Sequence, residues 1–295
     1  MTAPALSVVV STIGRPDAFR RLLVSVENST LAHRVQLVVV DQSDHQVCAA
    51  VLRERAWTFA SHVATSGRGA SVGRNEGMRH VTAPVVAFPD DDAWYPVDTL
   101  TRVSDAFARD GGLMALCGRQ VTADGGPSML RWLDRPAQVT PRNFLRTSIM
   151  STMFFRRSWL DTHEGFDEGM GVGSPGWYGA GEESDLLLRV VEDGHAVPYD
   201  PTLLVLQDEP RENPDEAFVR KMLSYGCGQG HLWRKRRLPR GLLAYYLARK
   251  VAGSGVRAAR GQRLLARADL AWLRGNVAGF VDRPPRELRD RATAP

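Results

Sequence analysis

The chain has 295 residues, of which 43% are hydrophobic and 24% are charged. This is the composition of a globular protein with a sizeable core, and it excludes collagen, coiled coils and low-complexity disorder. No apolar run reaches the ~18 residues that cross a bilayer, and residues 1–6 lack the pattern of an export signal, so we expect a cytoplasmic protein. The cysteines, Cys48, Cys117 and Cys227, have neither disulfide nor zinc-ligand spacing and are predicted to be reduced thiols.

The net charge of +5 is unevenly distributed along the chain. Residues 1–210 contain 19 basic and 26 acidic residues, a net charge of −7. Residues 211–295 contain 19 basic and 7 acidic residues, a net charge of +12. A charge step of this size indicates two physically different parts, an acidic body and a basic tail.

The body alternates short apolar runs with helical patterns. In residues 16–26, Phe19, Leu22 and Val26 fall on one helix face, and Pro16 stands in the first turn. In chain order, the body is predicted to form strands at 6–10, 35–40, 84–88 and 113–117 and helices at 16–26, 73–81 and 97–108. This alternation predicts βαβ units in an α/β fold, whose ligands bind at the carboxyl ends of parallel strands.

The alternation becomes irregular between residues 118 and 181, a stretch rich in glycine and proline. One strand is predicted there at 151–155, followed by a helix that ends at Glu192 ahead of Gly194, and a last strand at 203–206. The tail is predicted to be helical over 216–225, 242–251 and 262–273.

Three consecutive aspartates, Asp90, Asp91 and Asp92, follow the predicted strand at 84–88. Adjacent carboxylates repel one another and raise one another's pKa unless a cation lies among them. Hard oxygen ligands on a short loop suit Mg²⁺ or Mn²⁺, which also bind diphosphate oxygens. The alternative is a solvated acidic turn, but the position directly after a buried strand favours a functional cluster.

A second acidic cluster comprises Glu182, Glu183 and Asp185. If Glu183 or Asp185 opens the helix that ends at Glu192, these carboxylates favour the positive end of the helix dipole, and Asp185 is expected to cap the free amide groups. Such capping needs no function. A carboxylate that is partly desolvated at the edge of a cleft has a raised pKa, however, and can act as a general base.

Aromatic residues lie next to both acidic clusters. Trp94 and Tyr95 follow the aspartates, and Trp177 and Tyr178 precede the second cluster. Aromatic rings are common core residues, and they also provide surfaces on which sugars stack. All four are candidate platforms for a sugar or an acceptor.

Six motifs in this chain occur in the order seen in family 2 glycosyltransferases, and over roughly residues 5–210 the chain resembles this GT-A family. The motifs are Ser7–Pro16, Val38–Asp44, Gly69–Gly77, Asp90–Asp92, Gly165–Glu168 and Gly181–Asp185. Each motif has low specificity by itself, and the resemblance depends on the order of all six.

The resemblance implies a Rossmann-like α/β domain of the GT-A type over residues 1–210, with a mostly parallel central sheet flanked by helices. Residues 1–118 are expected to bind the nucleotide sugar and residues 119–210 the acceptor, and a basic helical extension follows over residues 211–295. The implied nucleotide-sugar contacts are Thr12, Arg15, Asp41, Arg74, Asp90 and Asp91, with Arg74 on the diphosphate and Asp90 near the ribose. Asp92, together with Asp90, is implied to hold Mg²⁺ or Mn²⁺.

The resemblance also implies inverting transfer of a sugar from a nucleoside-diphosphate sugar, with a carboxylate as general base. The family's catalytic Glu-Asp pair reads Glu182-Glu183 here, so Glu183 takes the place of the catalytic Asp, with Glu182 and Asp185 as neighbouring candidates. The expected acceptor contacts are Trp94, Trp177 and Tyr178. Many relatives have a metal-binding His after the late strand, where this chain has Gln207, a weaker ligand.

Two other functions remain open at this point. The Glu-for-Asp and Gln-for-His replacements are compatible with a catalytically silent relative that binds carbohydrate or membrane, from which release of a nucleoside diphosphate would distinguish an enzyme. A sugar-phosphate nucleotidyltransferase also uses paired aspartates, but its glycine-rich signature near the N-terminus is missing. The G-x-G-x-x-G fingerprint of dinucleotide oxidoreductases is missing as well.

The basic tail interleaves arginines with apolar residues. Such helices can lie on an anionic membrane, hold an anionic substrate, or pack as an appendage with their arginines in water. No recognition motif accompanies the arginines, so no nucleic-acid partner is expected. We expect a UDP-sugar as donor and a carbohydrate, lipid-linked or small-molecule acceptor, in a protein that is cytoplasmic or peripheral at the inner face of the membrane. The sequence leaves the oligomeric state open.

Overall fold

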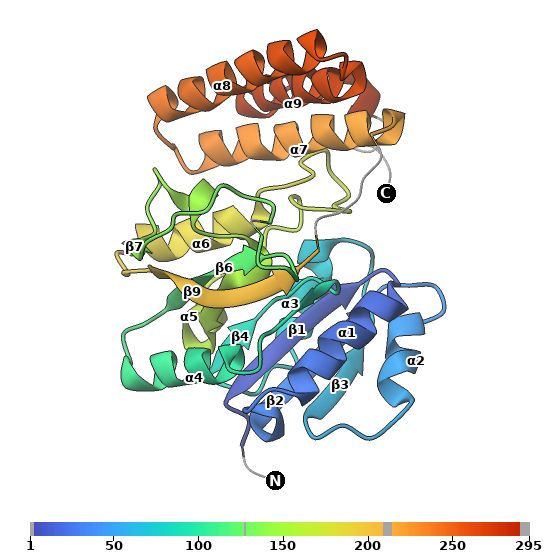
Figure 1. The fold of residues 1–295 in the computed structure, drawn as a ribbon, viewed down its shortest axis with the longest axis vertical. Helices are drawn as coiled ribbons and strands as arrows, with labels where there is room; N and C mark the ends of the chain where they lie inside the picture. Colours follow the sequence, from blue (N-terminus) through green and yellow to red (C-terminus); the bar gives the residue numbers. More distant parts are fainter. Residues whose placement is uncertain (1–2, 127, 209–213, 290–295) are drawn as a thin grey trace. The chain divides into compact units, whose positions relative to one another are not determined.

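The computed structural model describes residues 3–126, 128–208 and 214–289, and the chain divides into two compact units (Figure 1). The first unit comprises residues 1–166 and 186–209, and the second comprises residues 167–185 and 210–295. Sequence analysis divides the chain once, near residue 210. The structure groups residues 167–185 with the C-terminal helices because this segment packs on them, and the Gly179 amide donates to the Ser224 carbonyl at 3.1 Å.

A nine-stranded sheet forms the centre of the first unit. Its strands are β1 (Leu6–Thr12), β2 (Val35–Asp41), β3 (Ala60–Ala64), β4 (Val85–Ala87), β5 (Ala93–Trp94), β6 (Ala115–Val121), β7 (Ala137–Gln138), β8 (Met153–Arg156) and β9 (Pro198–Gln207). They lie in the order β3, β2, β1, β4, β8, β6, β9, β5, with β7 paired to β9. The neighbours from β3 to β4 are parallel, as are β6 and β9, whereas β8 enters antiparallel between β4 and β6.

Helices cover both faces of this sheet. The helices are α1 (Pro16–Glu27), α2 (Val47–Arg53), α3 (Ala70–Met78), α4 (Thr99–Arg109), α5 (Arg157–Asp161) and α6 (Glu182–Glu192), and short 3₁₀ turns occur at Ala32–Arg34, Phe144–Arg146 and Met150–Thr152. One core contains side chains of α1, α2 and α4 against alternate residues of β1 and β2, such as Val8 and Leu37. On the other face α3 lies so close to β1 that a Cβ on Gly77 would be 2.3 Å from Val9. The α/β fold class expected from the sequence is confirmed.

The carboxyl ends of three parallel strands meet at one edge of the sheet. Strand β1 lies between β2 and β4, and Thr12 at its end is in register with Asp41 at the end of β2. Asp90 follows the end of β4 by three residues. This edge therefore gathers side chains from three separate motifs.

The second unit contains α7 (Glu216–Lys235), α8 (Arg240–Ala259) and α9 (Arg263–Val281), followed by a 3₁₀ turn at Arg286–Leu288. Helix α9 packs against both α7 and α8 (Figure 1). All three helices were expected from the sequence, although each is longer than predicted. In the part of the chain that the structure describes, no helix is both long enough and apolar enough to span a membrane.

Glycines bring α7 and α9 into backbone contact. Gly226 and Gly230 lie four residues apart on α7, as do Gly275 and Gly279 on α9. A Cβ on Gly230 would lie 1.9 Å from the Asn276 carbonyl oxygen. A Cβ on Gly279 would be equally close to the Cys227 carbonyl oxygen. The spacing of four residues places each pair on one helix face, so both helices present a glycine surface to each other.

We expect Gly230→Ala to destabilise the second unit by about 1–3 kcal/mol or more, because the added methyl group meets a backbone atom that cannot move independently of α9. The measurement is the free energy of unfolding by chemical denaturation. Gly253→Ala in α8 is the matched control, since nothing lies within 4 Å of the position of its Cβ. That substitution should leave stability unchanged or raise it by up to ~1 kcal/mol, because alanine favours a helix over glycine. Equal effects of the two substitutions would contradict this account of the packing.

Candidate functional site

The three aspartates after β4 lie beside the end of β1. Asp91 is buried, with 2% of its surface exposed, and it accepts a hydrogen bond from the Thr12 hydroxyl. The guanidinium group of Arg15 forms ion pairs with Asp91 and Asp92. Burial raises the pKa of both carboxyl groups above the ordinary value, although the charge of Arg15 opposes this effect. Thr12, Arg15 and the aspartates, which sequence analysis assigned to one site, are therefore brought together.

Arg74 reaches the same cluster from α3. Its Nη2 lies 3.2 Å from Oδ1 of Asp90, and only 7% of the side chain is exposed. Gly73 allows α3 to approach the ends of β1 and β2, since a Cβ there would lie 2.1 Å from Oγ of Ser11. Close packing of the helix thus places a buried arginine next to the partly exposed carboxylate of Asp90.

Asp41 lies at the same edge but has a different environment. Its carboxylate accepts hydrogen bonds from the Ser43 amide and hydroxyl and from the amides of Cys48 and Ala49, at 2.6–3.0 Å. The residue is 1% exposed. These bonds satisfy amide groups at the start of α2 and fix the loop that leaves β2. In this structure Asp41 orders the loop at the edge of the site.

Gln207, at the end of β9, donates from Nε2 to Oδ1 of Asp92 at 2.9 Å. Its amide oxygen accepts from Nε2 of Gln120 on β6, also at 2.9 Å, and Gln120 in turn accepts from the Ser151 hydroxyl. An amide NH₂ group is a donor and cannot coordinate a cation. Gln207 therefore holds Asp92 through its amide nitrogen, while its amide oxygen accepts from Gln120.

Asp90 and Asp92 are the residues that the sequence predicts to hold a divalent cation. The Asp90 and Asp92 side chains are 35% and 23% exposed, and the two carboxylate oxygens of Asp92 accept from Arg15 and Gln207. Within the described residues, no three His, Cys, Asp or Glu side chains are grouped to hold a metal ion. Mg²⁺ and Mn²⁺ are commonly bound by one or two carboxylates, with substrate phosphates and water completing the shell. The two carboxylates fit that arrangement.

Helix α6 begins at Glu182, directly after Gly181, whose φ is +98°. The amide of Asp185 donates to the Gly181 carbonyl, so Asp185 lies inside the helix. The prediction that Asp185 caps the helix is wrong, because the helix starts earlier than expected. Its carboxylate instead binds Nε of Arg236 at 2.6 Å and Nζ of Lys235 at 3.1 Å, where Lys235 is the last residue of α7 and Arg236 follows it.

The three carboxylates of this cluster differ in accessibility. Asp185 is 1% exposed and Glu182 is 5% exposed, whereas Glu183 is partly exposed. Glu182 packs against Gly171, where a Cβ would lie 2.8 Å from the carboxyl carbon. Glu183 is therefore the most exposed residue of the cluster.

The aromatic candidates belong to different units. Trp94, in the first unit, is partly exposed, and the guanidinium carbon of Arg21 lies 3.7 Å from its ring centroid. The ring centroids of Trp177 and Tyr178, in the second unit, are 4.2 Å apart, and the ring planes are tilted by 35°. Trp177 is buried with side chains of α7, and Tyr178 also stacks on His231 at 3.9 Å. Trp177 is therefore a core residue of its unit, and Tyr178 and Trp94 retain exposed ring surface.

Sequence analysis missed several residues that shape these clusters. Gln120, on β6, orients Gln207, and Lys235 and Arg236 at the end of α7 form ion pairs with Asp185. Each is more than 40 residues from its partner in the chain, so no local pattern could identify the pair.

The family model described as glycosyl transferase family 2 matches residues 7–163. Among solved structures, the mannosyltransferase PcManGT from Pyrobaculum calidifontis in complex with GDP-Man and Mn²⁺ is similar, with 17% identity and a TM-score of 0.62, over 96% of this chain and 89% of that chain. S. aureus TarS 1–349 in complex with UDP-GlcNAc is similar over 95% of this chain and 93% of that chain, with 14% identity and a TM-score of 0.58. No curated protein matches the chain. The two structural similarities show a shared fold.

Proposed function

Because this chain is a member of glycosyl transferase family 2, and so a GT-A glycosyltransferase, we propose that it transfers a sugar from a nucleoside-diphosphate sugar to an acceptor hydroxyl with inversion at the anomeric carbon. The observation that supports this most directly is the convergence of Thr12, Arg15, Arg74 and the three aspartates at one edge of the sheet. Two positive and three negative groups in contact suit a ligand that carries both a diphosphate and a metal ion.

In the proposed donor site, Arg74 contacts the diphosphate and Asp90 lies near the ribose. Asp92 and Asp90 would hold Mg²⁺ or Mn²⁺, which, when bound, would offset the negative charge of the leaving nucleoside diphosphate. Asp91, buried between Thr12 and Arg15, fixes the loop that carries the other two aspartates. Thr12, Arg15 and the loop ordered by Asp41 border the space for the nucleoside. The Mn²⁺ complex of PcManGT supports a divalent metal, and the GDP-Man and UDP-GlcNAc complexes support a nucleotide-sugar donor.

In the proposed reaction, Glu183 accepts the proton of the attacking acceptor hydroxyl. The hydroxyl oxygen forms a bond to the anomeric carbon while the bond from that carbon to the diphosphate oxygen breaks, and the electron pair leaves with the nucleoside diphosphate. Arg74 stabilises the negative charge that develops on the leaving group. Glu182 is buried beside Glu183 and is proposed to orient the acceptor, and Asp185 holds the start of α6 through Arg236 and Lys235.

We expect one nucleoside-diphosphate sugar to raise the melting temperature of the protein, and Mn²⁺ to increase that shift. A ligand at 100 times its Kd stabilises the folded state by ~2.7 kcal/mol. The experiment is a thermal-shift screen of UDP- and GDP-sugars with Mn²⁺ and with EDTA, followed by an assay for released nucleoside diphosphate. Binding without release in the presence of acceptors would identify a catalytically silent relative. The absence of stabilisation by every donor would contradict the proposed function.

Peripheral membrane contact stays a prediction for the second unit. Helix α8 exposes the apolar side chains of Tyr245, Val251 and Val256, and Arg249 is exposed on the same helix. Basic helices with an exposed apolar face can lie on anionic membrane surfaces.

A further inference from the structure

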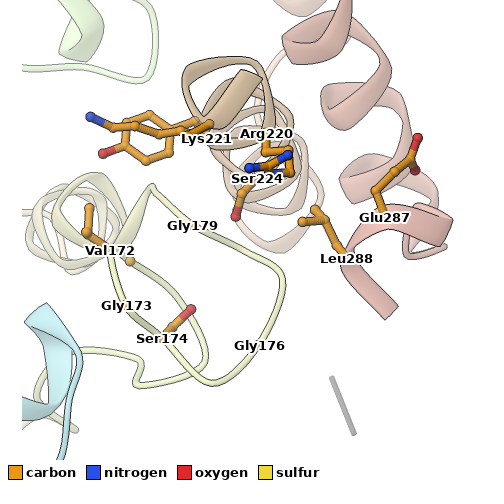
Figure 2. Close-up of a pocket in the computed structure, with 13 residues that line it drawn as sticks. Val172, Gly173, Ser174, Gly176, Gly179, Arg220, Lys221, Ser224, Glu287 and Leu288 are labelled. Atoms are coloured by element: carbon orange, nitrogen blue, oxygen red, sulfur yellow. The ribbon is translucent and has the colours of Figure 1, made fainter. Parts of the chain in front are cut away.

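The second unit contains a pocket of about 290 Å³ (Figure 2). Its walls are the loop from Gly171 to Gly179, the first half of α7 and the 3₁₀ turn at Arg286–Leu288. This volume is near the lower end of the range for small-molecule sites, ~300 Å³, and suits one small polar group or one sugar ring. The function derived above does not use this pocket.

Two basic residues line the pocket. Arg220 and Lys221 on α7 contribute side chains to the lining, and Figure 2 shows Arg220 beside Ser224 above the glycine-rich loop. Nζ of Lys221 lies 5.5 Å from the ring centroid of Tyr225, another lining residue. Arginine and lysine side chains bind phosphate and carboxylate groups, and arginine does so with two parallel hydrogen bonds.

The acidic residue of the lining is already neutralised. The Glu287 carboxylate binds Nη1 and Nη2 of Arg274 at 2.8 and 2.6 Å. Arg274 thereby lowers the pKa of Glu287. Glu287 is the acidic residue among the described residues of the lining, and Arg274, which pairs with it, is not a lining residue.

The loop that forms one wall of the pocket is held in close contact with α7. The Ser224 hydroxyl donates to the Trp177 carbonyl at 3.2 Å, and a Cβ on Gly179 would lie 2.3 Å from Oγ of Ser224. Gly171 and Gly173 have φ values of +103° and +76°, which side-chain-bearing residues rarely adopt. The loop therefore has a defined conformation that keeps it close to α7.

The same loop packs against Glu182, the neighbour of the proposed base. Gly171 lines the pocket, and a Cβ at this position would lie 2.8 Å from the carboxyl carbon of Glu182. Glu182 immediately precedes Glu183, the proposed base, in the first turn of α6. A group bound in the pocket is thus next to the segment that would remove a proton from the acceptor.

We propose that this pocket binds an anionic group of the acceptor, a phosphate or a carboxylate, through Arg220 and Lys221. The proposal rests on the proposed function, because it assigns the pocket to the acceptor of that reaction. It narrows the acceptor from any hydroxyl compound to a negatively charged one, such as a sugar phosphate, a phosphodiester or a uronic acid. Binding of the anion would orient the acceptor, and Glu183 would act on its hydroxyl.

The test measures the affinity of the full-length protein for inorganic phosphate, a hexose phosphate, a methyl glucuronide and the neutral methyl glucoside, by calorimetry at low ionic strength. We expect the anionic probes to bind and the neutral sugar to bind at least about 10-fold more weakly. The phosphate and glucuronide arms then show which anion the pocket prefers. Arg220→Gln should lower the affinity for the preferred anion by about 10-fold to 100-fold, and Arg220→Lys should recover part of that affinity.

Arg260→Gln is the matched control, because Arg260 is exposed in the same unit and does not line the pocket. It should leave anion affinity unchanged. An equal loss in the two glutamine variants, or no preference for anions over the neutral sugar, would overturn the proposal. Affinity for the nucleotide sugar is measured in parallel. If Arg220→Gln lowers the affinities for the donor and for the anion alike, the pocket is not an acceptor site. Failure of the wild-type protein to bind any donor would instead contradict the proposed function itself.

Discussion

Glutamine in place of Glu183 is expected to lower kcat by about 10²-fold to 10⁴-fold and to leave the affinity for the nucleotide sugar nearly unchanged. A general base contributes rate by accepting a proton in the transition state, and glutamine has similar size but cannot accept it. Glu183 is the member of its cluster with partly exposed surface, while Glu182 and Asp185 are buried. The measurement is the steady-state rate of nucleoside diphosphate release with acceptor, together with the donor Kd.

Two variants of neighbouring acids serve as controls for this assignment. Asp185→Asn removes the charge that holds Arg236 and Lys235. We therefore expect this variant to have a lower melting temperature and a kcat close to that of the wild type. Glu182→Gln should retain more activity than Glu183→Gln, because Glu182 packs against Gly171 and is buried. If Glu183→Gln turned over normally while either control were folded and inactive, the base would have to be reassigned.

The fold of the first unit could be predicted from local patterns because its central strands are buried on both faces. The apolar run at 35–40 and the helical face with Phe19 and Leu22 match β2 and α1 closely. The direction of β8 could not be predicted, since a strand's own residues do not specify which neighbours it pairs with. Strand β3 was missed because its residues, Ala60–Ala64, are partly exposed and include polar side chains.

In the second unit, glycine residues misled the prediction of helix length. The tail helix predicted over 216–225 ends where Gly226, Gly228 and Gly230 begin, since glycine weakens isolated helices. In the structure α7 continues to Lys235. The glycines allow α7 and α9 to touch through their backbones, and the packing gained there outweighs the low helix propensity.

The resemblance to family 2 glycosyltransferases assigned these residues to one donor site, and the structure brings most of them together because they follow strands whose carboxyl ends meet. Thr12 and Asp91 are 79 residues apart, yet the parallel order of β2, β1 and β4 brings them into hydrogen-bond contact. The pairing of Gln207 with Gln120 depends on β9 lying beside β6, which sequence patterns do not specify. The clustering of candidate residues at strand ends was thus accessible to prediction, while their supporting partners on distant strands were not.

Asparagine in place of Asp92 is expected to abolish the part of donor binding that depends on Mn²⁺. Asp92 is one of two partly exposed carboxylates at the edge, and neutralising it removes a charge that would balance the cation and the diphosphate. The measurement is the thermal shift with nucleotide sugar and Mn²⁺ against the shift with nucleotide sugar and EDTA. These two shifts should differ in the wild type and coincide in Asp92→Asn.

The environment of Asp92 makes this variant a specific test. Arg15 keeps its ion pair with the buried Asp91 when Asp92 is neutralised, so the loop has a remaining anchor and the domain should stay folded. Asp105→Asn, in α4 and exposed, is the matched control and should behave as the wild type does. Full turnover that is still inhibited by EDTA in Asp92→Asn would remove Asp92 from the metal site. In that case the Asp92 carboxylate would serve only to hold Arg15 and Gln207 at the edge of the sheet.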